Sequence, residues 1–259
     1  MKKTRLMIVF GEFKSGGGER EAISLLNGLD NRKFEKSLVC CSVSSSPTSL
    51  VRKNVTIVDL GHHPWWFFPV SIISFYRNLL KDSPDIVVSM MGRASLMTTI
   101  AAIFMPKKPK HIIWHHTLSS QWLIFQPHRK IQQGIIKYLY PFCHRVITIT
   151  QAIKKDLHQN FGINPDKIIV LPSMVDFDYI KKQAEKKLFV NISPNQSVIS
   201  FVGRLVKGKK VDVLLKAFNQ LSDIENNPLL IIAGSGPEEA PLKNLTRRLK
   251  IEEKVKFVG

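Results

Sequence analysis

Short apolar segments rich in β-formers alternate with segments of helical periodicity along almost all of this 259-residue chain. This alternation is typical of βαβ units, in which a helix joins two parallel strands. The pattern therefore predicts an α/β protein built on parallel sheets. In the first part of the chain the expected strands are Leu6–Phe10, Lys36–Ser42, Thr56–Leu60, Ile86–Ser89, His111–Trp114, Arg145–Thr148 and Ile168–Leu171, and the expected helices are Glu19–Leu29, Val70–Lys81, Ala94–Phe104, Lys130–Tyr140 and Ala152–Phe161.

The alternation is interrupted once, by a Lys-rich run at Lys181–Lys187 and a polar segment around Pro194, which predict a helix followed by a linker. We expect an N-terminal domain over residues 1–180, a linker over 181–197 and the first part of a second domain over 198–259. That second domain is expected to be incomplete, because a parallel sheet of three strands leaves faces and edges uncovered. Its expected elements are strand Val198–Val202, helix Val211–Leu221, strand Leu229–Ala233, helix Glu239–Leu249 and strand Val255–Val258.

The composition is strongly basic, with 38 Lys and Arg against 20 Asp and Glu and a formal net charge of +18. Such a surface suits an anionic membrane face, phosphorylated substrates or nucleic acid. The basic residues are spread along the chain, which disfavours a clustered nucleic-acid face. No nucleic-acid partner is expected, and a basic nucleic-acid-binding α/β protein remains the less favoured alternative.

Cysteine usage and hydropathy predict a cytoplasmic protein. Cys40 and Cys41 are adjacent and Cys143 stands alone, so the spacing shows no disulfide framework. The apolar N-terminal stretch is too short for a signal peptide, and no later apolar run reaches the roughly 18 residues of a membrane span.

Three glycine-containing loops each follow an expected strand and precede an expected helix: Ser15–Glu19, Gly203–Lys210 and Ala233–Glu238. Glycine lets the backbone approach a ligand closely, and a helix N-terminus offers N–H groups to a phosphate. The second loop adds Arg204 and Lys209, a planar fork of donors and a compact charge that suit a diphosphate. This loop is one residue away from a Walker A motif, but Lys210 stands where the magnesium-binding Ser or Thr belongs, which disfavours a P-loop NTPase.

Taken in order, four segments resemble the successive motifs of the family 4 retaining glycosyltransferases, a group with the GT-B fold. They are Ser15–Arg20, Gly203–Val206 with Lys209, Val211–Phe218 and Ile231–Pro237. The resemblance implies a Rossmann-like parallel-sheet N-terminal domain that holds the acceptor, and a second Rossmann-like domain that holds the donor.

The implied reaction transfers a sugar from a UDP- or GDP-sugar to a lipid-linked or saccharide acceptor with retention, in cell-surface polysaccharide, lipopolysaccharide or glycolipid synthesis. The resemblance implies neither a cofactor nor a metal. It also assigns site residues. His116, rather than its neighbour His115, is expected near the transferred sugar, and the catalytic residues are His116, Arg204 and Lys209. The expected donor-binding residues are Gly16, Gly17, Gly203, Arg204, Lys209, Gly234 and Gly236.

The sequence departs from the family pattern in three places. Lys210 follows Lys209 where the family has glycine, and Ser173-Met174 stands where the family has Asn-Gly, so backbone freedom is lost at both positions. The family's Glu-x7-Glu segment, which contacts the donor, has no counterpart before Gly259. The alternative is therefore a truncated, catalytically inactive glycosyltransferase fragment.

A cluster of aromatic residues, Trp65, Trp66, Phe67 and Phe68, stands beside an expected helix. Interfacial aromatic residues close to cations favour anionic lipid surfaces. Together with the basic excess, the cluster predicts peripheral association with the cytoplasmic membrane face. The alternative is that these side chains pack in the core or between domains.

Overall fold

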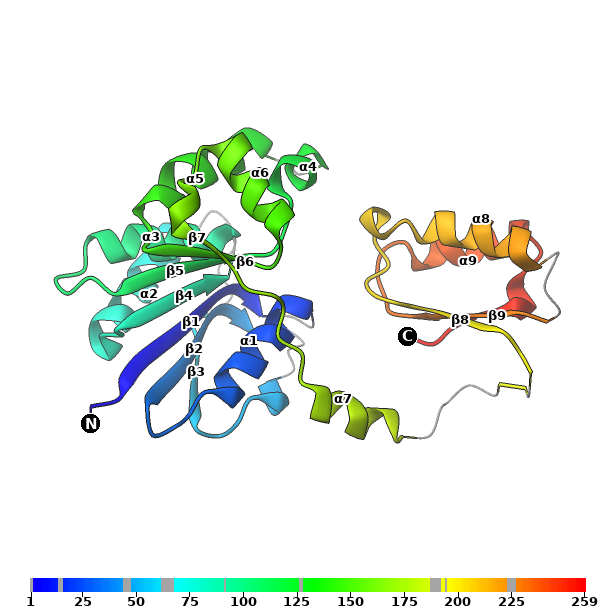
Figure 1. Cartoon of the computed structure of the whole chain (residues 1–259), viewed down its shortest axis with the longest axis horizontal. Coiled ribbons are helices and arrows are strands. Elements are labelled where there is room, and N and C mark those ends of the chain that lie inside the picture. Colours follow the sequence, from blue (N-terminus) through cyan, green and yellow to red (C-terminus); the bar gives the residue numbers. More distant parts are fainter. Residues whose placement is uncertain are drawn as a thin grey trace. The chain divides into compact units, whose positions relative to one another are not determined.

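The computed structural model describes residues 2–13, 16–43, 48–61, 68–90, 92–125, 128–186, 192–193, 195–222 and 227–259. The chain divides into two compact units, Met1–Lys181 and Lys182–Gly259. Each unit is built on its own parallel sheet with helices packed against it (Figure 1). The parallel α/β architecture that the alternation predicted is therefore confirmed.

The first unit contains a seven-stranded sheet in the order β3-β2-β1-β4-β5-β6-β7, and every neighbouring pair is parallel. The strand order reverses at β1, since β2 and β3 lie on one side of it and β4 to β7 on the other. In open α/β sheets, ligands bind outside the carboxyl ends of the strands at such a reversal. The strands are β1 (Thr4–Phe13), β2 (Phe34–Val43), β3 (Val55–Asp59), β4 (Ile86–Met90), β5 (Lys110–His115), β6 (Arg145–Thr148) and β7 (Ile168–Val170).

Helices cover both faces of this sheet. The side chains of β1 point alternately to the two faces, and apolar residues on both faces must be buried. Ile8 and Phe10 pack with helix α1 (Gly17–Gly28), whereas Met7 and Val9 pack with α2 (Phe68–Asp82) and α3 (Gly92–Ile103). A third core lies around strands β5, β6 and β7. It is formed with α5 (Arg129–Leu139) and α6 (Gln151–Phe161), whose predicted apolar stripe Ile153, Leu157 and Phe161 is buried.

Two further helices differ from the sequence expectation. The short α4 (Ser119–Trp122) was not predicted, and α7 (Phe177–Ala184) begins inside the expected first domain and ends inside the expected linker. The ring of Tyr179, on α7, lies 5.5 Å from the guanidinium of Arg20 on α1. The 3-10 helices are η1 (Thr48–Leu50), η3 (Leu123–Phe125), η4 (Tyr140–Phe142), η5 (Pro165–Lys167), η6 (Lys207–Lys209) and η7 (Glu252–Lys254).

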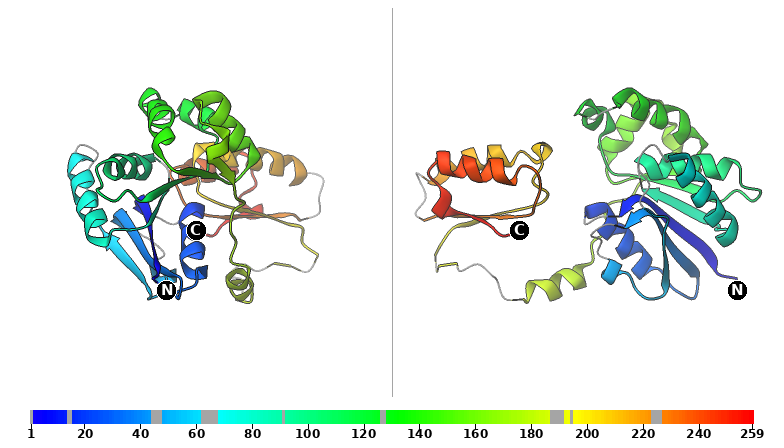
Figure 2. Two further views of the ribbon diagram at one scale, coloured as in Figure 1. Left: turned by 60° about the vertical axis from the view of Figure 1, so that its left-hand side comes forward. Right: turned by 180° about the vertical axis from the view of Figure 1, so that it is seen from behind.

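The second unit is a three-stranded parallel sheet in the order β10-β9-β8. Helices α8 (Val211–Ser222) and α9 (Glu239–Arg248) pack together against one face of it around Leu215 and Ile232 (Figure 2). On β8 the side chain of Val202 is 81% exposed. The strands are β8 (Val198–Val202), β9 (Leu229–Ala233) and β10 (Val255–Phe257).

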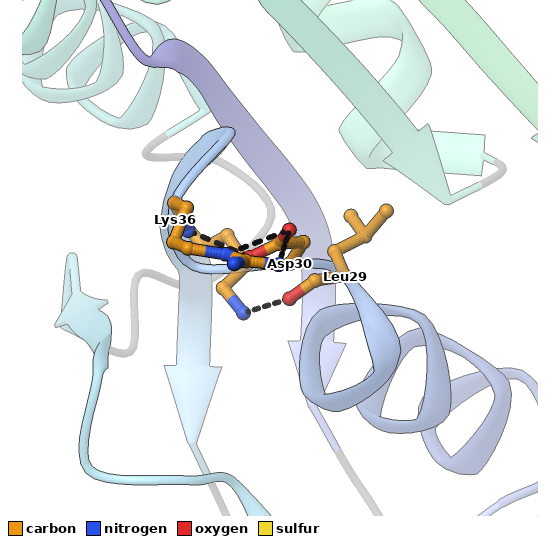
Figure 3. Close-up of polar contacts among 4 residues, drawn as sticks. Leu29, Asp30 and Lys36 are labelled. Carbon is orange, nitrogen blue, oxygen red and sulfur yellow. Dashed lines mark hydrogen bonds and ion pairs between the residues drawn. The ribbon is translucent and has the colours of Figure 1, made fainter.

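A buried lysine holds the C-terminal end of α1. Lys36, on β2, is 3% exposed, and its ammonium donates hydrogen bonds to the carbonyls of Leu26 at 2.7 Å and of Leu29 at 2.9 Å; Figure 3 shows the contact with Leu29. Burial lowers the pKa of Lys36, and the nearby charge of Arg52 acts in the same direction. The last carbonyls of a helix lack intrahelical partners and attract a cation, so this contact fixes α1 against β2.

Substituting Lys36→Met keeps the chain length of the side chain but leaves both carbonyls without their donor. We expect the free energy of unfolding of the first unit to fall by about 1–3 kcal/mol. Urea unfolding followed by tryptophan fluorescence measures this selectively, since all four tryptophans precede residue 181. The exposed Lys33→Met is the matched control, and equal midpoints for the two variants would contradict the capping role.

Candidate active site

Three segments of the first unit meet at the carboxyl edge of its sheet. Glu21 lies near the start of α1, His116 follows the last residue of β5, and Met174 lies in the segment after β7. Their side-chain and backbone atoms form one hydrogen-bonded group, described below. The group therefore lies where the reversed strand order places a ligand site.

The imidazole of His116 is held from two sides. Its Nε2 lies 2.6 Å from Oε2 of Glu21, and its ring stacks on the indole of Trp114 with centroids 5.6 Å apart and planes inclined by 22°. The side chain of His116 is 17% exposed, whereas that of Glu21 is 5% exposed. His116 is therefore accessible to a small ligand, while its carboxylate partner is not.

Both carboxylate oxygens of Glu21 have hydrogen-bond partners. Its Oε1 accepts a hydrogen bond from the backbone N–H of Met174 at 3.1 Å, and the side chain of Ser173 also hydrogen-bonds to the carboxylate. Burial by itself would raise the pKa of Glu21, but the hydrogen bonds from His116, Ser173 and Met174 outweigh burial and hold the pKa below its ordinary value. Glu21 is therefore ionised at neutral pH.

His115, the neighbouring histidine, has a different environment. It is 2% exposed, with Nδ1 3.0 Å from the Tyr140 hydroxyl and Nε2 2.8 Å from the Ser119 hydroxyl. Burial lowers the pKa of His115 to about 4, so the ring is neutral at neutral pH. Its hydrogen bonds are made with buried side chains inside the first unit. This contrast favours His116 over His115 as the residue that meets a substrate.

The two predicted glycines at the start of α1 are not equivalent. Gly16 is the N-cap residue of α1 in an extended conformation. A Cβ atom there would lie 2.5 Å from Oε2 of Glu19, whereas a Cβ atom on Gly17 would meet nothing within 4 Å. A side chain at 16 would therefore displace the flexible Glu19 carboxylate, whereas a side chain at 17 would meet open space. Ser15, which begins this motif, lies outside the described residues.

In the second unit the loops after β8 and β9 run side by side. The N–H of Gly203 donates to the carbonyl of Ala233, and the N–H of Leu205 donates to the carbonyl of Ser235, both at 2.9 Å. A Cβ atom on Gly234 would lie 1.9 Å from the carbonyl oxygen of Gly203, and one on Gly236 would lie 2.3 Å from that of Leu205. Close backbone packing thus requires glycine at 234 and 236 whether or not a ligand is present.

The predicted cations lie next to these paired loops. Arg204 follows Gly203 directly, and Lys209 ends η6 just before α8. Both side chains are exposed, as are those of Lys207 and Lys210. Neither Arg204 nor Lys209 forms an ion pair with any residue in the described ranges. The structure therefore groups Gly203, Arg204, Gly234 and Gly236 in adjacent loops, with a surplus of positive charge beside them.

Glu21 and Ser173 were not among the residues predicted from the sequence. The available signal was weak: Glu21 is a carboxylate on the otherwise apolar buried face of α1, beside Ala22 and Ile23. A buried carboxylate requires a partner. The sequence could therefore indicate that Glu21 has a polar partner, but it could not identify that partner as His116.

The two parallel sheets with their helices are those of the GT-B fold. Residues 15–179 match Glycosyltransferase Family 4 and residues 182–259 match Glycosyl transferases group 1, so the chain belongs to glycosyltransferase family 4. The resemblance stated from the motifs is confirmed.

Two relatives align with nearly the whole chain. An uncharacterized glycosyltransferase of Haemophilus influenzae is 28% identical over 94% of this chain and 65% of its own length. An N-acetylgalactosamine-N,N'-diacetylbacillosaminyl-diphospho-undecaprenol 4-alpha-N-acetylgalactosaminyltransferase of Campylobacter jejuni is 27% identical over 98% of this chain and 69% of its own length. This chain therefore spans about two thirds of the length of these relatives.

Solved structures show the same fold. Anabaena Alr3699/HepE in complex with UDP and glucose superposes with a TM-score of 0.78 at 17% identity, covering 99% of this chain and 69% of its own. The lipopolysaccharide outer core galactosyltransferase WaaB, in its apo form, superposes with a TM-score of 0.63 at 16% identity. The match covers 99% of this chain and 68% of WaaB. Among the described residues, no helix is long and apolar enough to cross a bilayer.

Lys210 adopts a left-handed backbone conformation, with φ of 53°. The resemblance implies glycine at this position, which fits the geometry, since a side chain in this conformation is strained. Met174, at the other departure, is not among the described residues with positive φ. The loss of glycine therefore has a backbone consequence at 210 and none of this kind at 174.

We expect Lys210→Gly to stabilise the second unit by about 1 kcal/mol, because the strain is relieved. Hydrogen exchange of β8 and α8, read by mass spectrometry, should slow by about fivefold in the variant. Lys207→Gly is the matched control, because Lys207 is exposed on the same loop with an ordinary φ, and we expect no stabilisation from it. Faster exchange in Lys210→Gly than in the unsubstituted chain would overturn this account.

Proposed function

We propose that this chain carries the acceptor domain and part of the donor domain of a retaining glycosyltransferase. It would transfer a sugar from a UDP- or GDP-sugar to a lipid-linked or saccharide acceptor, in the synthesis of a cell-surface polysaccharide or glycolipid. The observation that carries the proposal is the exposed Arg204 and Lys209 beside the paired loops at the carboxyl ends of β8 and β9. A diphosphate bound there would meet two cations and the N-terminus of α8.

In the proposed reaction the bond between the anomeric carbon and the diphosphate oxygen breaks, and its electron pair leaves with the diphosphate. Negative charge therefore grows on the leaving group, where Arg204 and Lys209 would stabilise it. The acceptor hydroxyl oxygen bonds to the same face of the anomeric carbon, which retains the configuration, and its proton passes to the departing diphosphate oxygen. His116 is proposed to contact the transferred sugar, with Gly16 and Gly17 approaching from the acceptor side, and Gly203, Gly234 and Gly236 lining the donor side.

The names of similar proteins support the substrate classes. The Campylobacter jejuni relative is named for transfer to a diphospho-undecaprenol-linked sugar, which supports a lipid-linked acceptor. The Anabaena structure contains UDP and glucose, which supports a UDP-sugar donor. WaaB is named as a lipopolysaccharide galactosyltransferase, which supports a role at the cell surface.

Calorimetric titration with UDP and with GDP tests the donor site. We expect one of the two to bind, and Arg204→Ala and Lys209→Ala each to weaken binding by about 10- to 100-fold, because each removes a charged hydrogen-bond donor worth about 1.5–3 kcal/mol. Lys216→Ala, an exposed lysine on α8, is the control for general loss of charge. Equal affinities for all three variants would contradict the assignment. Nucleotide binding without sugar transfer would favour the alternative of an inactive glycosyltransferase fragment.

We also propose peripheral association with the anionic cytoplasmic face of a membrane, through the surface formed by α4, η3, α5 and η4. The exposed cations Arg129, Lys130 and Lys137 lie on α5 of this surface, and Lys130 and Lys137 also line a groove of about 440 Å³ between α5 and α6. The predicted aromatic segment Trp65–Phe67 and the side chain of Phe68 lie outside the described residues. The exposed apolar side chains of the surface are Trp122 (43%), Ile124 (58%), Ile131 (55%), Tyr138 (66%) and Phe142 (68%).

Sedimentation with phosphatidylglycerol-containing and pure phosphatidylcholine vesicles tests this surface. Replacing Lys130 and Lys137 together by Gln should weaken binding to the anionic vesicles by about 30-fold, since each basic residue near such a surface contributes about 1 kcal/mol. The control replaces Lys181 and Lys182 on α7 by Gln, with the same change of charge. If the unsubstituted chain bound equally to the anionic and the neutral vesicles, the proposed membrane association would be ruled out.

A further inference from the structure

Glu21 is a buried charged group for which the motifs assign no role. We infer that Glu21 is the positioning residue of the active site: its carboxylate fixes the imidazole of His116 in one tautomer and one orientation. The consequence for catalysis rests on the proposed function, in which His116 contacts the transferred sugar. The effect of Glu21 on the tautomer and orientation of the His116 ring does not depend on the proposed function.

The tautomer follows from the chemistry of the contact. An ionised carboxylate can only accept hydrogen bonds, so in the 2.6 Å contact with Oε2 of Glu21 the proton belongs to Nε2 of His116. In the neutral ring Nδ1 is then the unprotonated nitrogen. A partner that fixes one nitrogen of an imidazole in this way decides which chemistry the other nitrogen performs.

The orientation is fixed by two perpendicular constraints. The hydrogen bond to Glu21 acts in the plane of the imidazole, and the stacked indole of Trp114, itself 1% exposed, blocks tilting of that plane. Glu21 cannot easily turn away, because Met174 N–H and Ser173 hold the carboxylate as well. A side chain held on several sides keeps the geometry that a reaction requires.

The carboxylate also sets the distance between His116 and Gly16, the residue at which α1 begins. Glu21 follows the N-cap residue Gly16 by five positions on α1, so His116 is tied to the same rigid helix that Gly16 caps. The third connection, to Met174, joins the segment that leads into α7. One side chain therefore holds three separate segments of the carboxyl edge in register.

A purely structural role would be a weak explanation for this group. Burying a carboxylate and a histidine is costly, and well-packed apolar residues in place of a buried ion pair are often neutral or stabilising. Three donors from two distant segments, His116 and the adjacent pair Ser173 and Met174, converge on one carboxylate. The tautomer of His116 distinguishes a positioning role, because packing alone would not change it.

Nuclear magnetic resonance of ring-¹⁵N-labelled histidine in the full chain tests the inference directly. We expect the unsubstituted protein to show His116 as the Nε2–H tautomer; an Nδ1–H ring would overturn the inference without any variant. In Glu21→Gln the amide oxygen can keep the bond from Met174 while the NH₂ group faces His116, so the tautomer should reverse to Nδ1–H. Glu35→Gln, an exposed glutamate on β2, is the control and should leave the ring unchanged.

A kinetic measurement tests the consequence for catalysis. Release of nucleoside diphosphate is followed from UDP-glucose, UDP-N-acetylgalactosamine and GDP-mannose. We expect Glu21→Gln to lower kcat by about 10- to 100-fold with KM unchanged, because a misprotonated ring loses its catalytic contribution while donor contacts persist. In a His116→Asn background the same substitution should have no further effect, since Glu21 acts through His116.

The two measurements separate the inference from the proposed function. A chain that turns over none of the three donors but shows the expected tautomers would refute the proposed activity and leave the positioning of His116 supported. Additive losses in the double variant, or an unchanged tautomer in Glu21→Gln, would refute the positioning role whatever the activity.

Discussion

The parallel pairing of the strands is the constraint on which the rest of this structure depends. Because all seven strands of the first sheet run the same way, every strand ends at one edge, and segments far apart in sequence meet there. The start of α1, the residue after β5 and the segment after β7 are brought together in this way. The same rule places the loops after β8 and β9 side by side in the second unit.

Helix α1 is held near both of its ends by buried charged side chains. Near its start, Glu21 is tied to His116 and Met174, and at its end the ammonium of Lys36 binds the carbonyls of Leu26 and Leu29. Both contacts use buried charges, which are costly unless their partners are in place. Their combined effect is that both ends of α1 are held by contacts with other segments of the first unit.

The glycines of the family motifs do several different things here. Gly234 and Gly236 allow two backbones to pack closely, and Gly16 leaves room for the Glu19 carboxylate. Lys210 is the opposite case, since it carries a side chain in a left-handed backbone conformation that suits glycine. A glycine motif by itself therefore says little about a ligand, and the argument for a diphosphate depends on the charges of Arg204 and Lys209.

The sequence by itself determined the α/β class, nearly all strands and long helices, and the family, because periodicity and local motifs are properties of neighbouring residues. It placed β1 at Leu6–Phe10, whereas the strand runs Thr4–Phe13 because Glu12 and Phe13 pair with Ser42 and Val43. It missed α4, whose four residues are too few to show a period. Only the tertiary structure decided that Glu21 meets His116, because the two residues are 95 positions apart in sequence and only the sheet topology brings them together.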